Sequence, residues 1–259
     1  MTAPHDAPLL TTLADGVLTL RMNRPAKKNA LTGEMYAAFA GALEDAEHSE
    51  AVRVVVVCGV PGAFSAGNDL EDFMQAQAAS GPRPAHRLIS ALTASTVPLV
   101  AAVDGVAVGI GTTMLFHCDF VYATQAAKFS LPFINLGLCA EAGSSLLLPR
   151  LAGYHHAARL LMLGDAFDAA EAQRLGLVHE ICDRESLETT AQTTAATLAA
   201  KPRQALRVTK ALLKRAEEPV AARVDAEIGQ FNTLLATPAA REIMSAFLAK
   251  RAPDRRLID

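Results

Sequence analysis

The sequence contains no tryptophan, no CxxC pair among its four cysteines and no large excess of charge of either sign. The formal net charge of −3 argues against a basic face for nucleic acid. Cysteines without metal-ligand spacing are typical of buried thiols in a cytoplasmic protein. The longest apolar run, Val97–Val103, is too short to cross a bilayer, and the N-terminus shows no secretory signal. We therefore expect a cytoplasmic protein that binds neither nucleic acid nor membrane.

Several catalytic signatures are also absent. There is no GxSxG, which disfavours a serine hydrolase, and no cluster of His, Cys and Asp with metal-ligand spacing. The glycines Gly109 and Gly111 are followed by Thr112, Thr113 and Met114, so a GxGxxG dinucleotide fingerprint is not completed. No metal site is predicted.

What is present is an alternation of β-rich and helical segments, typical of an α/β fold. Thr32 can cap a helix through about His48. Apolar β-branched runs predict strands that are buried on both faces. The runs of this kind are Val54–Cys58, Leu99–Val103 and Phe120–Ala123, and Val17–Met22 is predicted as a further strand.

The second half of the chain predicts a helical appendage. From about Asp183 the sequence is almost wholly helical, and Pro202, Pro219 and Pro238 divide it into separate helices. We expect an α/β core over residues 1–200 and a helical region over 201–259 that packs on the core or on another subunit. The polar segment Gln75–Arg87 predicts a loop.

Two glycine-containing turns offer backbone N–H donors. Phe64–Asp69 is a small-residue turn after a strand, and Val103–Gly111 joins a strand to a helix, where free N–H groups suit a developing negative charge. Each turn can also be an ordinary tight turn. Together, two such donor sites would make an oxyanion hole.

Glu141 is a lone acid among small and apolar residues. In a pocket, desolvation would raise its pKa and make it a usable general base. Alternatively, it is a first-turn acid of a helix over Ala142–Leu148, favoured by the helix dipole. We interpret His117 as a satisfied core histidine and Asp119 as structural.

These stretches, in this order, resemble the crotonase (enoyl-CoA hydratase/isomerase) family along nearly the whole chain. The family implies a spiral of ββα turns, a C-terminal trimerisation region and an acyl-CoA thioester substrate, with no tightly bound cofactor and a homotrimer or dimer of trimers as the assembly. The matching segments are Asn23–Leu31, Phe64–Asp69, Ala102–Thr113, Cys118–Ala123, Leu148–Gly153, Glu171–Val178 and Ala246–Pro253.

The resemblance also implies roles for particular residues. The N–H groups of Ala66 and Ile110 would form the oxyanion hole. Lys250 would reach the CoA of a neighbouring subunit, where a lysine can neutralise phosphate charge. The other implied substrate-binding residues are Arg24, Lys27 and Lys28 near the CoA nucleotide, and Asp69, Leu70, Phe73, Met74, Gly109, Phe133 and Phe247.

The departures from the family pattern carry the most information. Hydratases of this family use two glutamates, where this sequence has Thr113 and Phe133. The chain is instead similar to peroxisomal-type Δ3,Δ2-enoyl-CoA isomerases, whose single catalytic glutamate matches Glu141. The resemblance thus implies a shift of an acyl-CoA double bond from the 3 to the 2 position. The rivals are a hydratase, a thioester hydrolase and a non-catalytic acyl-CoA-binding module.

Overall fold

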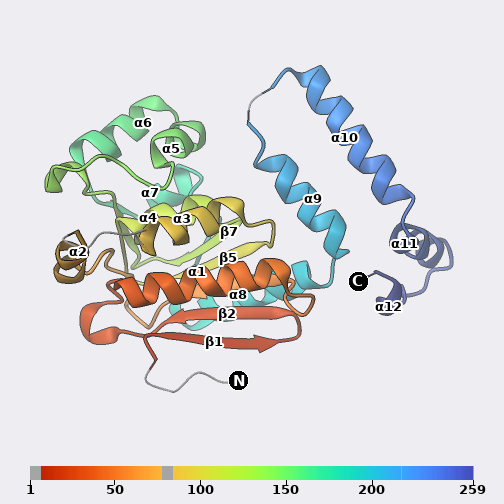
Figure 1. Ribbon diagram of the computed structural model, residues 1–259, viewed down its shortest axis with the longest axis horizontal. Helices are drawn as coiled ribbons and strands as arrows, with labels where there is room; N and C mark the ends of the chain where they lie inside the picture. The colour runs from red at the N-terminus through yellow and green to blue at the C-terminus, as the bar shows by residue number, and fades with distance from the viewer. Residues whose placement is uncertain (1–6, 78–83, 217, 259) are drawn as a thin grey trace.

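The computed structural model describes residues 7–77, 84–216 and 218–258. Its centre is a six-stranded sheet of order β1-β2-β3-β5-β7-β10 (Figure 1). The pair β1–β2 is antiparallel and the other pairs are parallel. The strands are β1 (Leu9–Ala14), β2 (Val17–Met22), β3 (Val54–Cys58), β5 (Leu99–Val103), β7 (Phe120–Thr124) and β10 (Glu180–Cys182).

A smaller second sheet has the order β4-β6-β8-β9. Three of its strands follow β3, β5 and β7 in the chain, so a strand pair recurs three times with helical segments between the pairs. This arrangement confirms the predicted α/β fold with a spiral of ββα turns. The strands are β4 (Ala63–Ser65), β6 (Val106–Val108), β8 (Lys128–Ser130) and β9 (Phe167–Asp168).

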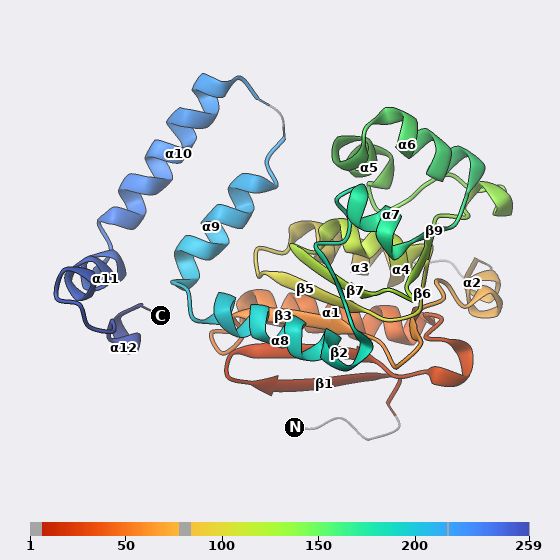
Figure 2. The ribbon, with the colours of Figure 1, turned by 180° about the vertical axis from the view of Figure 1, so that it is seen from behind.

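The central strands are buried on both faces, as their unbroken apolar runs predict. Val55 and Val57 of β3 belong to the main core, which also contains α1 (Gly33–His48) and α3 (Pro84–Ala94). Val54 and Val56 face a second cluster formed with α8 (Arg184–Ala199), which packs across β3, β5 and β7 and lies in front of the sheet in Figure 2. The sheet is therefore a rigid middle layer.

Short helices connect the strands on the side where the two sheets meet. Thr32 caps α1, as predicted, by accepting a hydrogen bond from the N–H of Met35 at 3.3 Å. The remaining helices of the core are η1 (Pro25–Lys27), α2 (Leu70–Gln77), α4 (Ile110–Thr113), η2 (Met114–His117), η3 (Ile134–Leu136), α5 (Ser144–Ala152), α6 (Tyr154–Ala158), the π-helix η4 (Arg159–Leu163) and α7 (Ala169–Arg174).

The prediction of a loop over Gln75–Arg87 is wrong at both ends. Helix α2 continues through Gln77, and α3 begins at Pro84, where a proline fits the first turn of a helix. Residues 78–83 of that predicted loop lie outside the described residues.

The C-terminal segment forms an arm that extends from one side of the core (Figures 1 and 2). Its helices are α9 (Arg203–Leu213), α10 (Val220–Leu235), α11 (Pro238–Leu248) and α12 (Arg255–Ile258). The three prolines predicted to divide this tail do stand at the starts of α9, α10 and α11. No helix among the described residues is long and apolar enough to cross a membrane.

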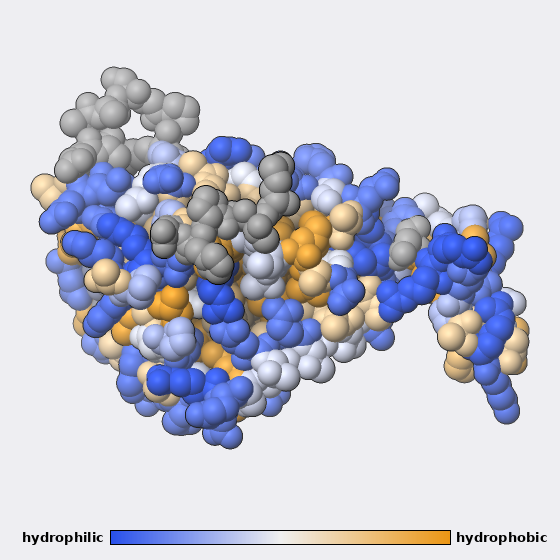
Figure 3. Space-filling view, turned by 90° about the horizontal axis from the view of Figure 1, so that it is seen from below, coloured by the Kyte–Doolittle hydropathy of each residue, from blue (hydrophilic) through white to orange (hydrophobic). Residues whose placement is uncertain are grey.

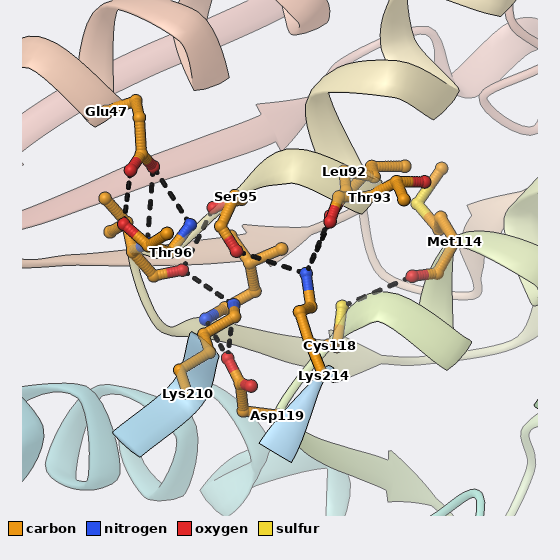
Figure 4. Close-up of polar contacts among 12 residues, drawn as sticks. Glu47, Leu92, Thr93, Ser95, Thr96, Met114, Cys118, Asp119, Lys210 and Lys214 are labelled. Atoms are coloured by element: carbon orange, nitrogen blue, oxygen red, sulfur yellow. Dashed lines mark hydrogen bonds and ion pairs between the residues drawn. The ribbon is translucent and has the colours of Figure 1, made fainter. Parts of the chain in front are cut away.

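Helix α9 is held to the core by cationic side chains that bind main-chain carbonyls. Lys214 Nζ donates to the carbonyls of Leu92, Thr93 and Ser95 at 3.0, 3.1 and 3.1 Å, at the C-terminal end of α3 (Figure 4). The buried Lys210 donates to the Val97 carbonyl and pairs with Asp119, both at 2.7 Å. Cations at a helix C-terminus are favourably placed.

Candidate active site

A cavity of about 460 Å³ lies between the two glycine-containing turns and the segment that carries Glu141. A volume of this size is in the range of small-molecule sites. Its described lining is largely apolar and contains one carboxylate, that of Glu141. The lining residues are Ala66, Gly67, Asn68, Leu70, Ala85, His86, Ile89, Val108, Gly109, Pro132, Phe133, Asn135, Leu136, Leu138, Cys139 and Glu141.

The first turn presents a free backbone donor, but not at the predicted residue. The N–H of Ala66 donates to the carbonyl of Lys28 at 2.8 Å, so the role predicted for Ala66 is wrong. The N–H of Asn68, two residues later, donates to no acceptor in the part of the chain that the structure describes. The cavity-facing donor of this turn is therefore Asn68.

The second turn presents the N–H of Ile110, the first residue of α4. This N–H has no acceptor among the described residues, whereas those of Thr112 and Thr113 donate to the Gly109 carbonyl at 2.9 and 2.8 Å. Gly109 adopts φ 55° and ψ −118°, a conformation that favours glycine. Ile110 thus remains a candidate oxyanion donor, as predicted.

The two turns lie in direct contact. A Cβ on Gly67, whose φ is +89°, would lie 2.8 Å from the Val108 carbonyl oxygen. A Cβ on Gly111 would lie 2.7 Å from the Ser65 carbonyl oxygen. Glycine at both positions lets the backbones approach closely, so the turns that carry Asn68 and Ile110 lie against each other.

A buried side chain that sequence reasoning overlooked supports the first turn. Asn29 is fully buried, and its amide nitrogen donates to the carbonyls of Ala63 and Phe64 at 2.8 and 3.1 Å. Ser65 Oγ donates back to the Asn29 carbonyl at 2.9 Å. Asn29 lies inside Asn23–Leu31, one of the segments that resemble the family, but no role was predicted for Asn29 itself.

Tyr36 is a second overlooked residue. Its hydroxyl donates to the side-chain oxygen of Asn68. Burial, with smaller contributions from the charges of Glu141 and Asp72, raises the pKa of Tyr36 above its usual range, so the phenol stays protonated. Tyr36 therefore holds Asn68 in place from α1.

Glu141 lies on a strained turn rather than on a helix. It precedes α5, whose first residue is Ser144, so the alternative of a first-turn helix acid is wrong. Ala142 and Gly143 both adopt left-handed conformations, at φ 51° and 71°. A non-glycine residue in that region costs about 1 kcal/mol or more, a cost that is common at functional sites.

The environment of Glu141 suits a base. Thr113 Oγ1 donates to its Oε1 at 2.6 Å. Burial raises the pKa of Glu141, and this effect is opposed by the Thr113 hydrogen bond and by the charge of His86. A carboxylate with a raised pKa removes protons more readily near neutrality.

The two positions where family hydratases have glutamates contribute no carboxylate. Thr113 is fully buried and its hydroxyl is used by Glu141. Phe133 is buried, and its ring lies 3.9 Å from where a Cβ of Gly109 would be. This wall of the cavity is thus apolar, and both Gly109 and Phe133 line it, as predicted.

Two of the predicted substrate-binding residues, Arg24 and Asp69, form an ion pair with each other. Arg24 Nη1 pairs with Asp69 Oδ2 at 2.7 Å, and the guanidinium beside Asp69 lowers the pKa of that carboxyl. Asp69 also accepts from the N–H groups of Glu71 and Asp72 at 3.2 and 3.3 Å at the start of α2. Neither side chain lines the described cavity, and the substrate contacts predicted for the two residues stay predictions.

The other predicted substrate contacts are distributed more widely. Leu70 lines the cavity, whereas Met74 is 72% exposed and does not. Phe73 lies in α2, but its side chain is outside the described structure. Lys27 and Lys28 are exposed beside the first turn, and the roles predicted for them stay predictions.

Phe247 and Lys250 lie at the end of α11, in the arm and away from this chain's cavity (Figure 1). Neither residue lines the described cavity, and the contacts with CoA predicted for them stay predictions.

Other titratable candidates are structural, as predicted. His117 is buried, and its Nε2 lies 2.9 Å from the Ala142 carbonyl oxygen, directly behind Glu141. Asp119 is held by Lys210. Cys139 is exposed and lines the cavity, contrary to the expectation of buried thiols. No group of His, Cys, Asp and Glu among the described residues has the arrangement of a metal site.

Comparisons with known proteins agree with this site. Residues 12–256 match the enoyl-CoA hydratase/isomerase family. The chain is 34% identical to 1,2-epoxyphenylacetyl-CoA isomerase of Escherichia coli over 95% of this chain and 97% of that one. It is also 34% identical to enoyl-CoA delta isomerase 2 of Rattus norvegicus, over 93% of this chain and 62% of that one.

The fold also matches a solved structure from Magnetospirillum magneticum AMB-1, a protein whose proposed activity is enoyl-CoA hydratase/carnithine racemase. The TM-score is 0.92 and the identity 48%, over 95% of this chain and 98% of that one. The E. coli relatives also include 2,3-dehydroadipyl-CoA hydratase, at 34% identity over 95% and 97% of the two chains. Isomerases and hydratases are thus similarly distant from this chain. The chain belongs to the enoyl-CoA hydratase/isomerase family, in the crotonase superfamily, and is an enzyme of that family.

Proposed function

We propose that this enzyme is a Δ3,Δ2-enoyl-CoA isomerase. The observation that carries the proposal is the single carboxylate, Glu141, on the described wall of a cavity that is also lined by Asn68 and by Gly109, the residue before Ile110; the N–H groups of Asn68 and Ile110 have no acceptor among the described residues. A 1,3-proton shift needs one base that can also return the proton, together with stabilisation of an enolate oxygen. This site contains both.

The reaction begins when the substrate's thioester oxygen accepts hydrogen bonds from the N–H groups of Asn68 and Ile110. Glu141 then removes a proton from the α-carbon, and the electron pair moves toward that oxygen to give a dienolate. Donors placed where charge develops contribute roughly 3–4 kcal/mol each. The protonated Glu141 returns the proton to the γ-carbon, which leaves the double bond at the 2 position.

The rival activity is hydration, since one of the relatives at 34% identity is a hydratase. Adding water across a 2-enoyl thioester needs a positioned water molecule and a second general acid–base group. Thr113 donates its hydroxyl to Glu141, and the Phe133 ring disfavours water at the other position. We therefore expect hydration to be at least about 100-fold slower than isomerisation, the lower end of the effect of one acid–base group.

The test measures both rates on one enzyme preparation. A 3-enoyl-CoA and the matching 2-enoyl-CoA are supplied separately, and the absorbance of the conjugated thioester is followed. In the first assay we expect 2-enoyl-CoA to appear from the 3-enoyl-CoA. In the second we expect the added 2-enoyl-CoA to be lost only slowly. Hydration equal to or faster than isomerisation across chain lengths would establish a hydratase, and release of free CoA would establish a thioester hydrolase. No turnover of either ester, with binding retained, would establish the non-catalytic module.

We also propose that the CoA moiety is bound by more than one copy of the chain. Phe247 and Lys250 lie in the arm and are exposed, where another subunit's CoA can meet them. A homotrimer or dimer of trimers would supply that contact.

A further inference from the structure

Asn68 combines a free backbone N–H with a polar side chain that the proposed reaction does not use. The residue is half-buried and lines the same cavity as Glu141. Its side-chain oxygen Oδ1 accepts a hydrogen bond from the hydroxyl of Tyr36, a buried residue of α1. Its amide nitrogen Nδ2 binds no acceptor in the part of the chain that the structure describes. One end of the amide is therefore held by the protein, and the other is left for a ligand.

The orientation of this amide follows from the buried phenol. The Tyr36 hydroxyl makes no other hydrogen bond to the described residues. If the amide were turned around, the phenol would accept from Nδ2 and its own proton would lack an acceptor. A buried donor without an acceptor is costly, so the amide oxygen faces Tyr36. Burial raises the pKa of Tyr36, so the hydroxyl keeps the proton that it donates.

The backbone of Asn68 is fixed from another side. Leu31 and Asn68 form a parallel β-bridge. The N–H of Leu31 donates to the Gly67 carbonyl at 2.7 Å, and the N–H of Asp69 donates to the Leu31 carbonyl at 2.9 Å. In a bridge of this kind one residue bonds to both neighbours of its partner, so the N–H of the partner points the other way. The free N–H of Asn68 is thus directed away from Leu31.

We propose that Asn68 binds the substrate through its side-chain amide as well as its N–H, and that Tyr36 is the positioning residue that presents the amide nitrogen to the thioester oxygen. The inference rests on the proposed function in placing that oxygen at the N–H of Asn68. An asparagine side chain is short, so Nδ2 stays close to the N–H of its own residue. A further donor where negative charge develops stabilises the dienolate more than the ground-state thioester.

Tyr36 contributes without touching the substrate. The terminal torsion of an asparagine side chain has broad preferences, so an unbound amide samples several orientations. The hydrogen bond to Oδ1 restricts that torsion, and it also polarises the amide so that Nδ2 becomes a better donor. Because Tyr36 acts only through Asn68, the effect of removing its hydroxyl must vanish once the Asn68 side chain is gone.

The first experiment is a double-mutant cycle on kcat of the full-length enzyme. We expect Asn68→Ala to lower kcat by about 100-fold, the lower end for one oxyanion donor. Tyr36→Phe should lower kcat by roughly 2- to 12-fold, the range of one net hydrogen bond, with KM little changed. In the Asn68→Ala background Tyr36→Phe should have no further effect. Asn68→Asp keeps the shape and the acceptor for Tyr36 but loses the donor, so kcat should fall at least as far as in Asn68→Ala.

Tyr122→Phe is the matched control. Tyr122 is also buried, and its hydroxyl shares a hydrogen bond of 2.7 Å with Thr194 of α8, in the cluster that α8 forms with the sheet. It does not line the cavity. This variant should lose a similar amount of thermal stability to Tyr36→Phe and keep its kcat. An equal fall in kcat in the two variants would overturn the inference, because the loss would then follow from any missing buried hydroxyl.

The second experiment needs no turnover. Difference infrared spectroscopy measures the carbonyl stretch of a bound saturated acyl-CoA that is isotope-labelled at the thioester carbonyl. Donors to the oxygen lower this frequency, so the lowering in the wild type should be smaller in Tyr36→Phe and Asn68→Ala and unchanged in Tyr122→Phe.

Equal frequencies in the wild type, Tyr36→Phe and Asn68→Ala would overturn the inference even if the enzyme is an isomerase. So would wild-type kcat in Asn68→Asp, or losses of kcat that multiply in the double variant. The expected frequency differences without isomerisation would reject only the isomerase.

Discussion

Glu141 is the residue on which the proposed chemistry depends most directly. Replacing it by Gln keeps the shape and removes the carboxylate, so isomerisation should fall by about two to four orders of magnitude. Acyl-CoA binding should change little, because the oxyanion donors of Asn68 and Ile110 belong to the backbone. Steady-state rates and CoA-ester affinity measure the two effects.

The matched control for this variant is Asn135→Asp, which adds a carboxylate elsewhere on the same cavity wall. It should not restore turnover when combined with Glu141→Gln, since its position relative to the donors differs. Near-normal turnover in Glu141→Gln alone would reject Glu141 as the base.

Thr113 controls how easily Glu141 ionises. Its hydroxyl donates to the carboxylate and thereby lowers the pKa of Glu141, against the rise caused by burial. Thr113→Val removes the donor, so the pKa of Glu141 should rise further. The base form is lost as the pH falls through that pKa, so the acidic limb of kcat/KM should move to higher pH. Thr113→Ser, which keeps the hydroxyl, should leave the limb in place, and an unmoved limb in Thr113→Val would contradict this role.

At this scale the sequence allowed some residues to be predicted and not others. An isolated acid and small-residue turns are visible in the chain, but it was the family resemblance that singled out Glu141 as the base and Ile110 as a donor. The role predicted for Ala66 was wrong because an N–H group of a turn is free only if no acceptor from elsewhere in the chain binds it. The N–H of Ala66 is bound by the Lys28 carbonyl, which comes from a distant segment. The ion pair of Arg24 with Asp69 was not predicted for a similar reason, since it joins residues 45 positions apart.

At the scale of elements, close contact between α4 and β4 aligns the two donors. Gly111→Ala places a methyl group where only 2.7 Å separates it from the Ser65 carbonyl oxygen. Overpacking of this kind costs about 1–3 kcal/mol of unfolding free energy, and displacing α4 moves the Ile110 donor. We expect lower thermal stability together with a fall in kcat.

The control is Gly41→Ala in α1, where the nearest atom lies 3.9 Å from the added Cβ. This variant should be neutral or slightly stabilising, because alanine favours helix. Thermal unfolding and turnover distinguish the two substitutions. If Gly111→Ala and Gly41→Ala have equal thermal stability and equal turnover, the contact of Gly111 with Ser65 does not position the Ile110 donor.

Helix α9 is joined to the core by charge rather than by apolar packing. Lys210→Met removes a buried ammonium and leaves Asp119 without that partner, although Leu99 N still donates to the carboxylate at 2.7 Å. Hydrogen bonds to charged groups contribute about 1.5–3 kcal/mol, so unfolding free energy should fall by that order. Chemical denaturation of the single variants and of the double variant with Asp119→Asn gives the coupling; additive effects would contradict the pairing.

The strands that were predicted are those with unbroken β-branched runs, and β2, β3 and β5 begin and end where expected. The short strands β4, β6 and β8 were not predicted. Each has three residues and is held in place by pairing with a distant strand rather than by local preference. The start of α3 was predicted as loop because the polar residues and prolines in 75–87 favour a loop. The contacts with α1 that stabilise this part of the helix are not visible in the sequence.

On the scale of the whole molecule, the arm exposes more apolar surface than a folded domain normally leaves in water. Phe231 is 66% exposed, Phe247 81% and Leu248 82%. In Figure 3 the arm projects from one end of the body, with apolar side chains among the charged ones. Several large apolar side chains left exposed on one part of a molecule are typical of an interaction site.

We therefore predict that copies of this chain assemble through the arm, as a trimer or a dimer of trimers. Phe247→Asp puts a charge where a large apolar side chain would be buried, and an unpaired buried charge is strongly unfavourable, so the assembly should shift toward monomers. Thr197→Asp, an equal change of charge on the exposed face of α8, is the control. Sedimentation velocity measures the mass, and CoA-ester affinity should fall with the assembly, because Phe247 and Lys250 are predicted to complete a neighbour's site.

Deleting the residues after Thr237 should produce both effects more strongly. A truncated chain that is monomeric, stable and fully active would show that each chain binds its substrate alone.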